Sequence, residues 1–214
     1  MKAILFDLDC TLHDRKSSIS SFVEAQYKQL LSFDSSLPPR YIQRFHQLEK
    51  NGYIWKDKVY HSLQEEFRLP LSPSELLTEY ITFFHSHCSE TPYATEVLTS
   101  LRQSGYLLGL ITNGKTTFQH ATINALQLAP YFDVILISEE VGLKKPDPAI
   151  FSLALERLQI PATEAVYIGD SIENDVLAPQ LISMKSILFA PLNTSPQNTY
   201  PVITCLRELT ERFQ

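Results

Sequence analysis

Three short apolar runs in this chain end abruptly in polar residues, most of them acidic or hydroxylated. The runs are 3–6, 107–111 and 165–168, and they are followed by Asp7, Thr112 and Asp170, the last after one glycine. A continuous apolar run bounded by turn residues is typical of a strand that is buried on both faces, as in a parallel sheet. In open parallel sheets, ligands bind just beyond the carboxyl ends of the strands. The pattern therefore predicts a parallel sheet with a functional site at that edge.

The segment between the first two runs has helical periodicity instead. Apolar residues recur there at spacings of three and four over four stretches, 17–33, 38–48, 55–69 and 72–84, with capping or breaking residues at their ends. Consecutive amphipathic helices joined by short turns predict a small helical bundle. We therefore expect two domains, an α/β core of residues 1–15 and 90–214 and an inserted helical domain of residues 16–89.

Helical and strand patterns alternate from residue 94 onward. The expected helices cover 94–103, 116–126 and 148–158, and the expected strands cover 106–111, 134–137, 165–168 and 186–189, the last preceded by a short helix. This alternation predicts right-handed βαβ units, and hence a doubly wound, Rossmann-like α/β core. The polar, proline-containing stretch 194–201 is expected to be a loop before a short strand and a terminal helix.

Composition and charge narrow the class of protein. A chain of 214 residues that is 44% hydrophobic and 20% charged is typical of a folded globular protein. Its net charge of −6 argues against binding to nucleic acid or to an anionic membrane. No apolar run reaches the roughly 20 residues that span a bilayer, and three cysteines without a CxxC pair fit a reducing compartment. We expect a cytoplasmic monomer or homodimer.

Four aspartates near the ends of the apolar runs predict a cation site. If Asp7, Asp9, Asp170 and Asp175 converge, their charges repel unless some stay protonated or a cation lies among them. Hard oxygen ligands without converging histidine or cysteine favour Mg²⁺, which keeps open positions for substrate oxygens such as those of phosphate.

The same residues suit the transfer of a phosphoryl group. In the Asp7-Leu8-Asp9 pair, one carboxylate can attack phosphorus, and the other can protonate the leaving group and later activate water. Thr112 and Asn113 can donate hydrogen bonds to phosphoryl oxygens, and a lysine can offset their charge.

Taken together, the polar segments resemble the four signature motifs of the haloacid dehalogenase (HAD) superfamily of hydrolases. In order, they are Asp7-Leu8-Asp9-Cys10-Thr11-Leu12, Ile111-Thr112-Asn113-Gly114, Gly142-Leu143-Lys144-Lys145-Pro146-Asp147-Pro148 and Gly169-Asp170-Ser171-Ile172-Glu173-Asn174-Asp175. The resemblance implies that Asp7 is the nucleophile and Asp9 the general acid and base, with Lys145 stabilising charge. It also implies that Thr112 and Asn113 bind the phosphoryl group.

The same resemblance implies a Mg²⁺ ion held by Asp7, the backbone carbonyl of Asp9 and Asp170, with Asp175 in support. The helical insertion is similar to the cap that closes over the site in this family and selects substrate. An acid at position 9 resembles the phosphatase and phosphomutase branches, because halide-displacing members lack it. We expect a Mg²⁺-dependent phosphatase that hydrolyses small phosphorylated metabolites through an aspartyl-phosphate. A phosphomutase or phosphotransferase, or a catalytically silent binding module, remains the alternative.

Some residues have more than one interpretation. Lys144 competes with Lys145, and His13 could touch substrate or the hinge to the helical domain. Further candidates are more often surface charge, turn or packing residues: Arg44, Trp55, Lys56, Lys58, His85, His87, Glu139 and Glu140. Two positions depart from the family pattern, Pro179 and Ser183, where proline can kink a short helix and serine stands in place of a helix-ending glycine.

Overall fold

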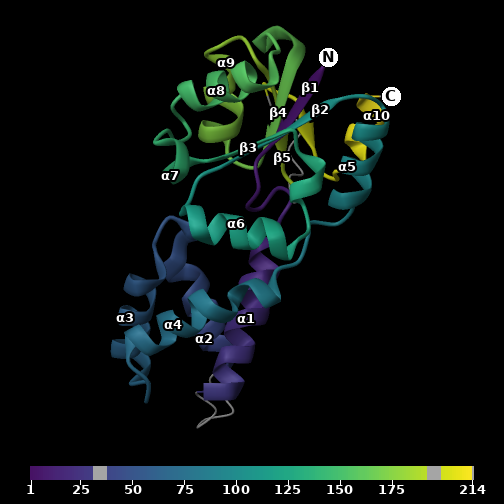
Figure 1. Cartoon of the computed structure of the whole chain (residues 1–214). Helices are drawn as coiled ribbons and strands as arrows, with labels where there is room; N and C mark the ends of the chain where they lie inside the picture. Colours follow the sequence, from purple (N-terminus) through teal and green to yellow (C-terminus); the bar gives the residue numbers. More distant parts are fainter. Residues whose placement is uncertain (31–37, 192–198, 214) are drawn as a thin grey trace. The chain divides into compact units, whose positions relative to one another are not determined.

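The computed structural model describes residues 1–30, 38–191 and 199–213 (Figure 1). The chain divides into two compact units, one of residues 1–14 with 90–214 and one of residues 15–89. The expected end of the first helix, at residues 31–33, and residues 194–198 of the expected loop lie outside the described residues. Among the helices that are described, none combines the length and apolar character that crossing a membrane requires.

In the larger unit, the described residues form six strands and several helices in alternation. The strands are β1 (Ala3–Phe6), β2 (Leu107–Thr112), β3 (Val134–Ile137), β4 (Ala165–Gly169), β5 (Lys185–Phe189) and β6 (Val202–Ile203). The helices are α5 (Ala94–Gln103), α6 (Thr116–Ala125), α7 (Ser138–Val141), α8 (Ala149–Leu158), η5 (Ile172–Leu177, a π-helix), α9 (Ala178–Gln180) and α10 (Glu208–Arg212). Short 3-10 turns, η3 (Ala129–Tyr131) and η4 (Ala162–Glu164), precede β3 and β4.

All six strands are parallel, in the order β3-β2-β1-β4-β5-β6. β1 lies in the interior of the sheet, and Phe6 is in register with Leu110 of β2 and with Ile168 of β4. The chain builds outward from β1 in one direction through β2 and in the other through β4. This reversal of strand order is the topological switch point at which doubly wound sheets bind ligands. The predicted fold class is confirmed.

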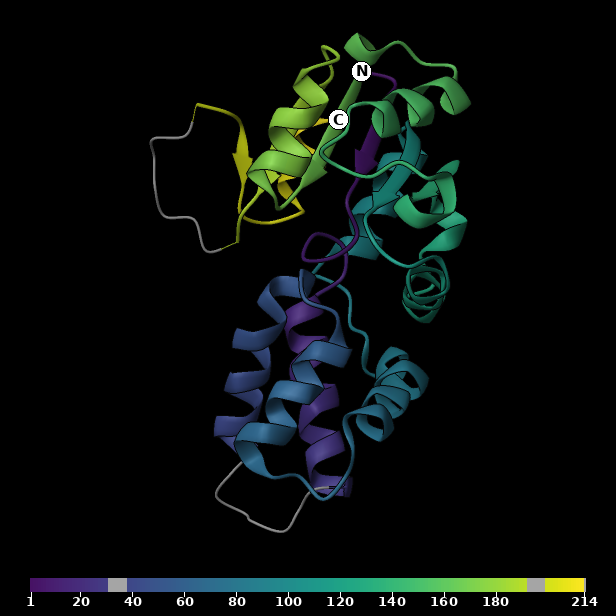
Figure 2. The ribbon, with the colours of Figure 1, turned by 90° about the vertical axis from the view of Figure 1, so that its left-hand side faces the viewer.

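Alternate residues of β1 enter two separate apolar cores. Ile4 and Phe6 pack in a core with α5 and α10, whereas Ala3 and Leu5 pack in a core with α8. Helices therefore cover both faces of the sheet, and Figure 1 shows α8 on one side of the strands and α5 and α10 on the other. Figure 2 views the same unit from the side of α8. Burial on both faces explains why the strands are continuously apolar rather than alternating.

The helical unit contains α1 (Arg15–Leu30), α2 (Pro38–Glu49), α3 (Lys56–Phe67) and α4 (Pro73–Phe83), with short 3-10 turns η1 (Lys50–Gly52) and η2 (Phe84–His87). The predicted start of the fourth helix is confirmed. Ser72 accepts a hydrogen bond from the Glu75 backbone N–H, and the Glu75 carboxylate accepts one from the Ser72 N–H. This reciprocal pair satisfies two N–H groups at the helix start. In the core, Phe22 contacts the rings of Tyr80 and Phe84 edge-on.

The two departures behind the acidic loop have local solutions. Pro179 is the second residue of α9, which follows η5 without a break, so its missing N–H falls where the π-helix gives way to α-helix. Ser183 has φ of 64°, so it adopts the left-handed conformation that glycine usually supplies. Neither residue interrupts β4 or β5.

Candidate active site

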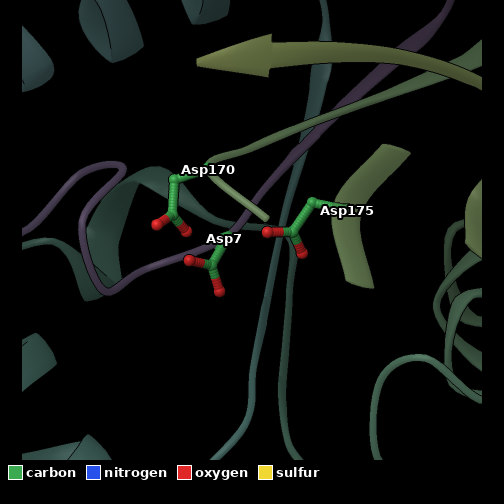
Figure 3. A group of neighbouring side chains, drawn as sticks. All are labelled: Asp7, Asp170 and Asp175. Carbon is green, nitrogen blue, oxygen red and sulfur yellow. The ribbon is translucent and has the colours of Figure 1, made fainter. Parts of the chain in front are cut away.

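Three aspartates converge at the carboxyl edge of the sheet. Asp7 directly follows β1 and Asp170 directly follows β4, while Asp175 lies on η5. Each offers a carboxylate oxygen, and these oxygens all lie within 4.8 Å of one another. Figure 3 shows the three side chains turned toward a common space. Because β1 and β4 are parallel neighbours, residues that follow them in the sequence are brought to the same place.

Lys145 is the cation at the centre of this cluster. Its Nζ donates to Asp7 Oδ1 at 2.6 Å, to Asp175 Oδ1 at 2.7 Å and to the Tyr167 hydroxyl at 2.9 Å. A lysine ammonium has three donors, so these bonds use all of them. The Lys145 side chain is buried, whereas Lys144 is exposed. The geometry thus distinguishes the two lysines in favour of Lys145.

The electrostatics show that the cluster is short of positive charge. Burial is the largest influence on Asp7 and raises its pKa. The Lys145 ammonium opposes this shift, but repulsion from Asp175 and Asp170 adds to it, so the pKa of Asp7 stays well above its usual value. Asp170 reaches solvent, yet lost hydration and repulsion from Asp175 raise its pKa to about 6. Burial alone would lower the pKa of Lys145, but Asp175 and Asp7 raise it well above normal.

This donor set fits a hard divalent cation. Three carboxylates face one ammonium, and carboxylate oxygens are the ligands that Mg²⁺ prefers. The second oxygen of Asp175 accepts the Ser171 N–H at 3.0 Å, which fixes its carboxylate. Gly169 makes room for this side chain, because a Cβ at position 169 would lie 2.4 Å from Asp175 Cγ.

Thr112 and Asn113 lie at the end of β2, the other neighbour of β1. The Asn113 side chain forms two hydrogen bonds with the backbone of Lys145. Its Oδ1 accepts the Lys145 N–H at 2.9 Å, and its Nδ2 donates to the Lys145 carbonyl at 2.8 Å. This reciprocal pair fixes the backbone that carries Lys145. Thr112 is buried and accepts a hydrogen bond from Gln119 at 2.6 Å. Their binding of a phosphoryl group stays a prediction.

The side chain of Asp9 is not part of the three-aspartate group but belongs to a second cluster beside it. His13 Nδ1 lies 2.8 Å from Asp9 Oδ1, and Gln119 Nε2 donates to Asp9 Oδ2 at 3.1 Å. We expected His13 to touch either substrate or the hinge to the helical domain. The structure shows a different contact, because the imidazole lies against Asp9 of the acidic motif.

Two residues that contact the site, Tyr167 and Gln119, were not among the candidates predicted from the sequence. Tyr167 lies inside a fully buried strand, and a buried hydroxyl needs a partner. That signal was available, although its partners, Lys145 and the Ile111 carbonyl, were not. No signal identified Gln119, because it lies 110 residues from Asp9 along the chain.

Most of the remaining candidates have structural partners. In the helical unit, Lys56 is buried and donates to Glu49 at 2.9 Å, and Trp55 packs edge-on against Tyr80. The others form surface contacts or are exposed: Arg44 pairs with Glu66, Lys58 is exposed, His87 bonds to Ser21, Glu139 accepts the Thr116 N–H, and Glu140 contacts His120.

Comparison with known proteins assigns the family. The model of the haloacid dehalogenase-like hydrolases matches residues 4–189. The chain is 28% identical over 200 residues to a glyceraldehyde 3-phosphate phosphatase of Pyrococcus abyssi, covering 88% of this chain and 81% of that protein. It is 30% identical over 184 residues to the pyrimidine 5'-nucleotidase YjjG of Escherichia coli, covering 81% and 79%. Among solved structures, the chain resembles the crystal structure of a HAD phosphatase from Thermococcus onnurineus, with a TM-score of 0.68 and 29% sequence identity. The match covers 99% of this chain and 97% of that protein. The chain therefore belongs to the haloacid dehalogenase-like hydrolases.

Proposed function

We propose that this protein is a Mg²⁺-dependent phosphatase of small phosphorylated metabolites that works through an aspartyl-phosphate on Asp7. The observation that carries the proposal is the placement of Asp7 beyond the interior strand β1, bonded to Lys145 and facing two further carboxylates. Relatives named as phosphatases support hydrolysis of phosphoric monoesters.

The two carboxylates of the first motif would divide the chemistry. An oxygen of Asp7 attacks phosphorus, and the bond from phosphorus to the leaving oxygen breaks while Asp9 gives that oxygen its proton. Asp9, now ionised, takes a proton from water as the water oxygen attacks phosphorus. The bond to Asp7 then breaks, and inorganic phosphate leaves with both aspartates restored.

Lys145 supports the first step by stabilising the ionised form of Asp7. Burial and neighbouring carboxylates raise the pKa of Asp7, so an attacking carboxylate needs positive charge nearby. Asp7 and Asp170, with Asp175 in support, are the side chains that would hold Mg²⁺. When bound, this ion would neutralise charge on these carboxylates and on the phosphoryl oxygens.

We also propose that the helical unit, residues 15–89, serves as the cap that selects substrate. Its insertion between the first and second motifs supports this role. The similar proteins include a glyceraldehyde 3-phosphate phosphatase and a pyrimidine 5'-nucleotidase. A panel of triose phosphates, nucleoside monophosphates and phosphoserine, ranked by kcat/KM, would identify the preferred class.

Hydrolysis of p-nitrophenyl phosphate tests the reaction directly. We expect turnover that requires Mg²⁺, is abolished by EDTA and is lost in Asp7→Asn, while Glu139→Gln, an exposed acid outside the cluster, retains it. Activity that persists in Asp7→Asn would rule out the aspartyl-phosphate. Phosphate and nitrophenol should be released in equal amounts. Nitrophenol release that exceeds phosphate release when an acceptor alcohol is present would indicate a phosphotransferase, because the alcohol then takes the phosphoryl group.

A further inference from the structure

Two buried side chains, those of His13 and Gln119, contact the Asp9 carboxylate, which is partly exposed to solvent. The Asp9 side chain is 32% exposed, whereas His13 and Gln119 are 1% and 2% exposed. His13 Nδ1 lies 2.8 Å from one carboxylate oxygen, and Gln119 Nε2 donates to the other at 3.1 Å. With a contact on each oxygen, the carboxyl plane has a defined orientation.

The imidazole of His13 is carried on a fixed segment of backbone. The His13 N–H donates to the Leu8 carbonyl at 2.9 Å, and the His13 carbonyl accepts the Cys10 N–H at 2.9 Å. His13 also forms an antiparallel bridge with Glu90, where the chain returns to this unit. These bonds close the loop that carries Asp9 and fix the backbone from which the imidazole reaches it.

Gln119 connects Asp9 to the end of β2. Its Nε2 also donates to Thr112 Oγ1 at 2.6 Å and lies 3.2 Å from the Asn113 carbonyl. These partners all accept, so they determine which end of the amide faces Asp9. Gly114 leaves the space for this side chain, because a Cβ there would lie 2.8 Å from Gln119 Cγ, and its φ is +154°. The glycine at position 114 thus allows the Gln119 side chain to pack directly against the backbone there.

We propose that His13 and Gln119 are positioning residues that hold the Asp9 carboxyl group where it exchanges a proton with the leaving oxygen and with the attacking water. The inference rests on the proposed function, since it assigns partners to the acid and base of that reaction. Without both contacts, the Asp9 side chain would sample several rotamers, and a misplaced acid or base loses much of its effect.

The two chemical steps depend on Asp9 to different extents when the leaving group is varied. p-Nitrophenolate leaves without protonation, so forming the aspartyl-phosphate from p-nitrophenyl phosphate needs little help from Asp9. Its hydrolysis still needs Asp9 to deprotonate water. An alkyl phosphate needs the Asp9 proton in the first step as well.

Rapid-mixing kinetics of His13→Ala and Gln119→Leu therefore test the proposal. With p-nitrophenyl phosphate, we expect a burst of one nitrophenol per active site, then a steady state reduced about 10- to 100-fold, because the phosphoryl-enzyme accumulates. With the best alkyl phosphate of the panel, we expect no burst and a similar fall in kcat, with KM changed less than about threefold.

Two further variants separate positioning from a purely structural role. In His13→Asn, the amide nitrogen takes the place of Nδ1, so it should recover most of the lost rate; His13→Ala should not. His120→Ala removes the neighbouring histidine of α6, which contacts Glu140 on the surface, and should behave as wild type. Thermal unfolding of each variant shows whether the fold is intact.

Several outcomes would overturn the inference. One is a loss of the burst with p-nitrophenyl phosphate that is as large as the loss of steady-state rate with both substrates, together with no recovery in His13→Asn. Another is faster turnover in His13→Ala, which would mean that the contacts restrain Asp9 rather than position it. Asp9→Asn and wild type, measured in the same assay, show whether a negative result contradicts the proposed function or only the positioning role. An inactive wild type contradicts the proposed function, whereas an active wild type with a typical Asp9→Asn burst and unaffected His13 and Gln119 variants contradicts only the positioning role.

Discussion

The two units each bury a cluster of charges, and the two clusters have opposite composition. In the α/β unit, the Lys145 ammonium bonds to Asp7 and Asp175, and Asp170 lies beside them. In the helical unit, the Glu49 carboxylate lies between Arg15, at 3.0 Å, and Lys56, at 2.9 Å. The cluster of the α/β unit has an excess of carboxylates, and the cluster of the helical unit has an excess of cationic side chains.

The pKa shifts of the acids distinguish the two clusters. Burial alone would raise the pKa of Glu49, but hydrogen bonds and charge from Arg15 and Lys56 bring it below the usual value. The pKa values of Asp7 and Asp170 are raised instead. Glu49 is therefore stabilised as an ion by its own unit, whereas the aspartates need a further positive charge. The direction of the pKa shift of the buried acids therefore separates a structural ion cluster from a candidate reaction centre.

Removing the cation of the acidic cluster should have the largest effect on activity. Lys145→Met leaves Asp7 and Asp175 facing each other without a counter-charge, so we expect kcat for p-nitrophenyl phosphate to fall about 10²- to 10³-fold. The matched control is Lys144→Met, which removes the exposed neighbour and should retain the wild-type rate. Equal rates in the two lysine variants would contradict the assignment.

Removing the acid of the basic cluster should instead affect stability. Glu49→Gln takes away the carboxylate between two buried cations, so we expect the free energy of unfolding to fall by about 3 kcal/mol in urea. Because the folded pKa of Glu49 is lowered from 4.5, this difference should be complete at pH 7 and shrink as the pH falls below about 4.5. Glu66→Gln, which breaks a surface pair with Arg44, should cost less than about 1 kcal/mol. A Glu49→Gln variant as stable as wild type would make the cluster dispensable for folding.

Crowding the acidic cluster should reduce both activity and stability, each to a moderate extent. Gly169→Ala places a Cβ 2.4 Å from Asp175 Cγ, so we expect kcat to fall about tenfold as the carboxylate is displaced. Gly109→Ala is the matched control, because its Cβ would lie 2.7 Å from Leu5 Cγ within the apolar core. Both variants should lose about 1–3 kcal/mol of stability from overpacking, but only Gly169→Ala should lose activity per folded molecule. Equal activity in the two folded variants would show that the position of Asp175 is unimportant.

The sheet was predictable because burial on both faces leaves a direct trace in the sequence. The strand over 134–137 and the helix over 94–103 were placed to the residue. β2 runs one residue later than expected, over Leu107–Thr112, and β5 starts one residue earlier, at the exposed Lys185. A polar residue at a strand end carries no apolar signal, so such boundaries depend on pairing with the neighbouring strand.

The candidate site was predictable only in part. The aspartates were recognised because their positions after buried strands, and the motifs that contain them, lie within short stretches of sequence. The contacts that orient them do not: Lys145 meets Tyr167, and Asp9 meets Gln119, across 22 and 110 residues of chain. A tyrosine in an apolar strand is indistinguishable from a packing residue until its hydroxyl is placed. Long-range hydrogen bonds of this kind follow from the folded sheet rather than from any local pattern.

The smallest effect concerns the response of the acidic cluster to pH. Because the pKa of folded Asp170 is raised from 3.8 to about 6, the folded protein keeps this proton to higher pH than the unfolded chain. Without Mg²⁺, its contribution to stability is therefore complete below about pH 4 and is lost as the pH rises through 6. The proposed Mg²⁺ ion would compete with that proton, so millimolar MgCl₂ should raise Tm by a few degrees at pH 7.5 and by much less at pH 5. Asp170→Asn should abolish the difference between the two pH values, while Glu140→Gln, an exposed acid outside the cluster, should preserve it. A rise in Tm that is equal at both pH values would mean that Mg²⁺ binds elsewhere, and the contrast between the two clusters would then lose its functional meaning.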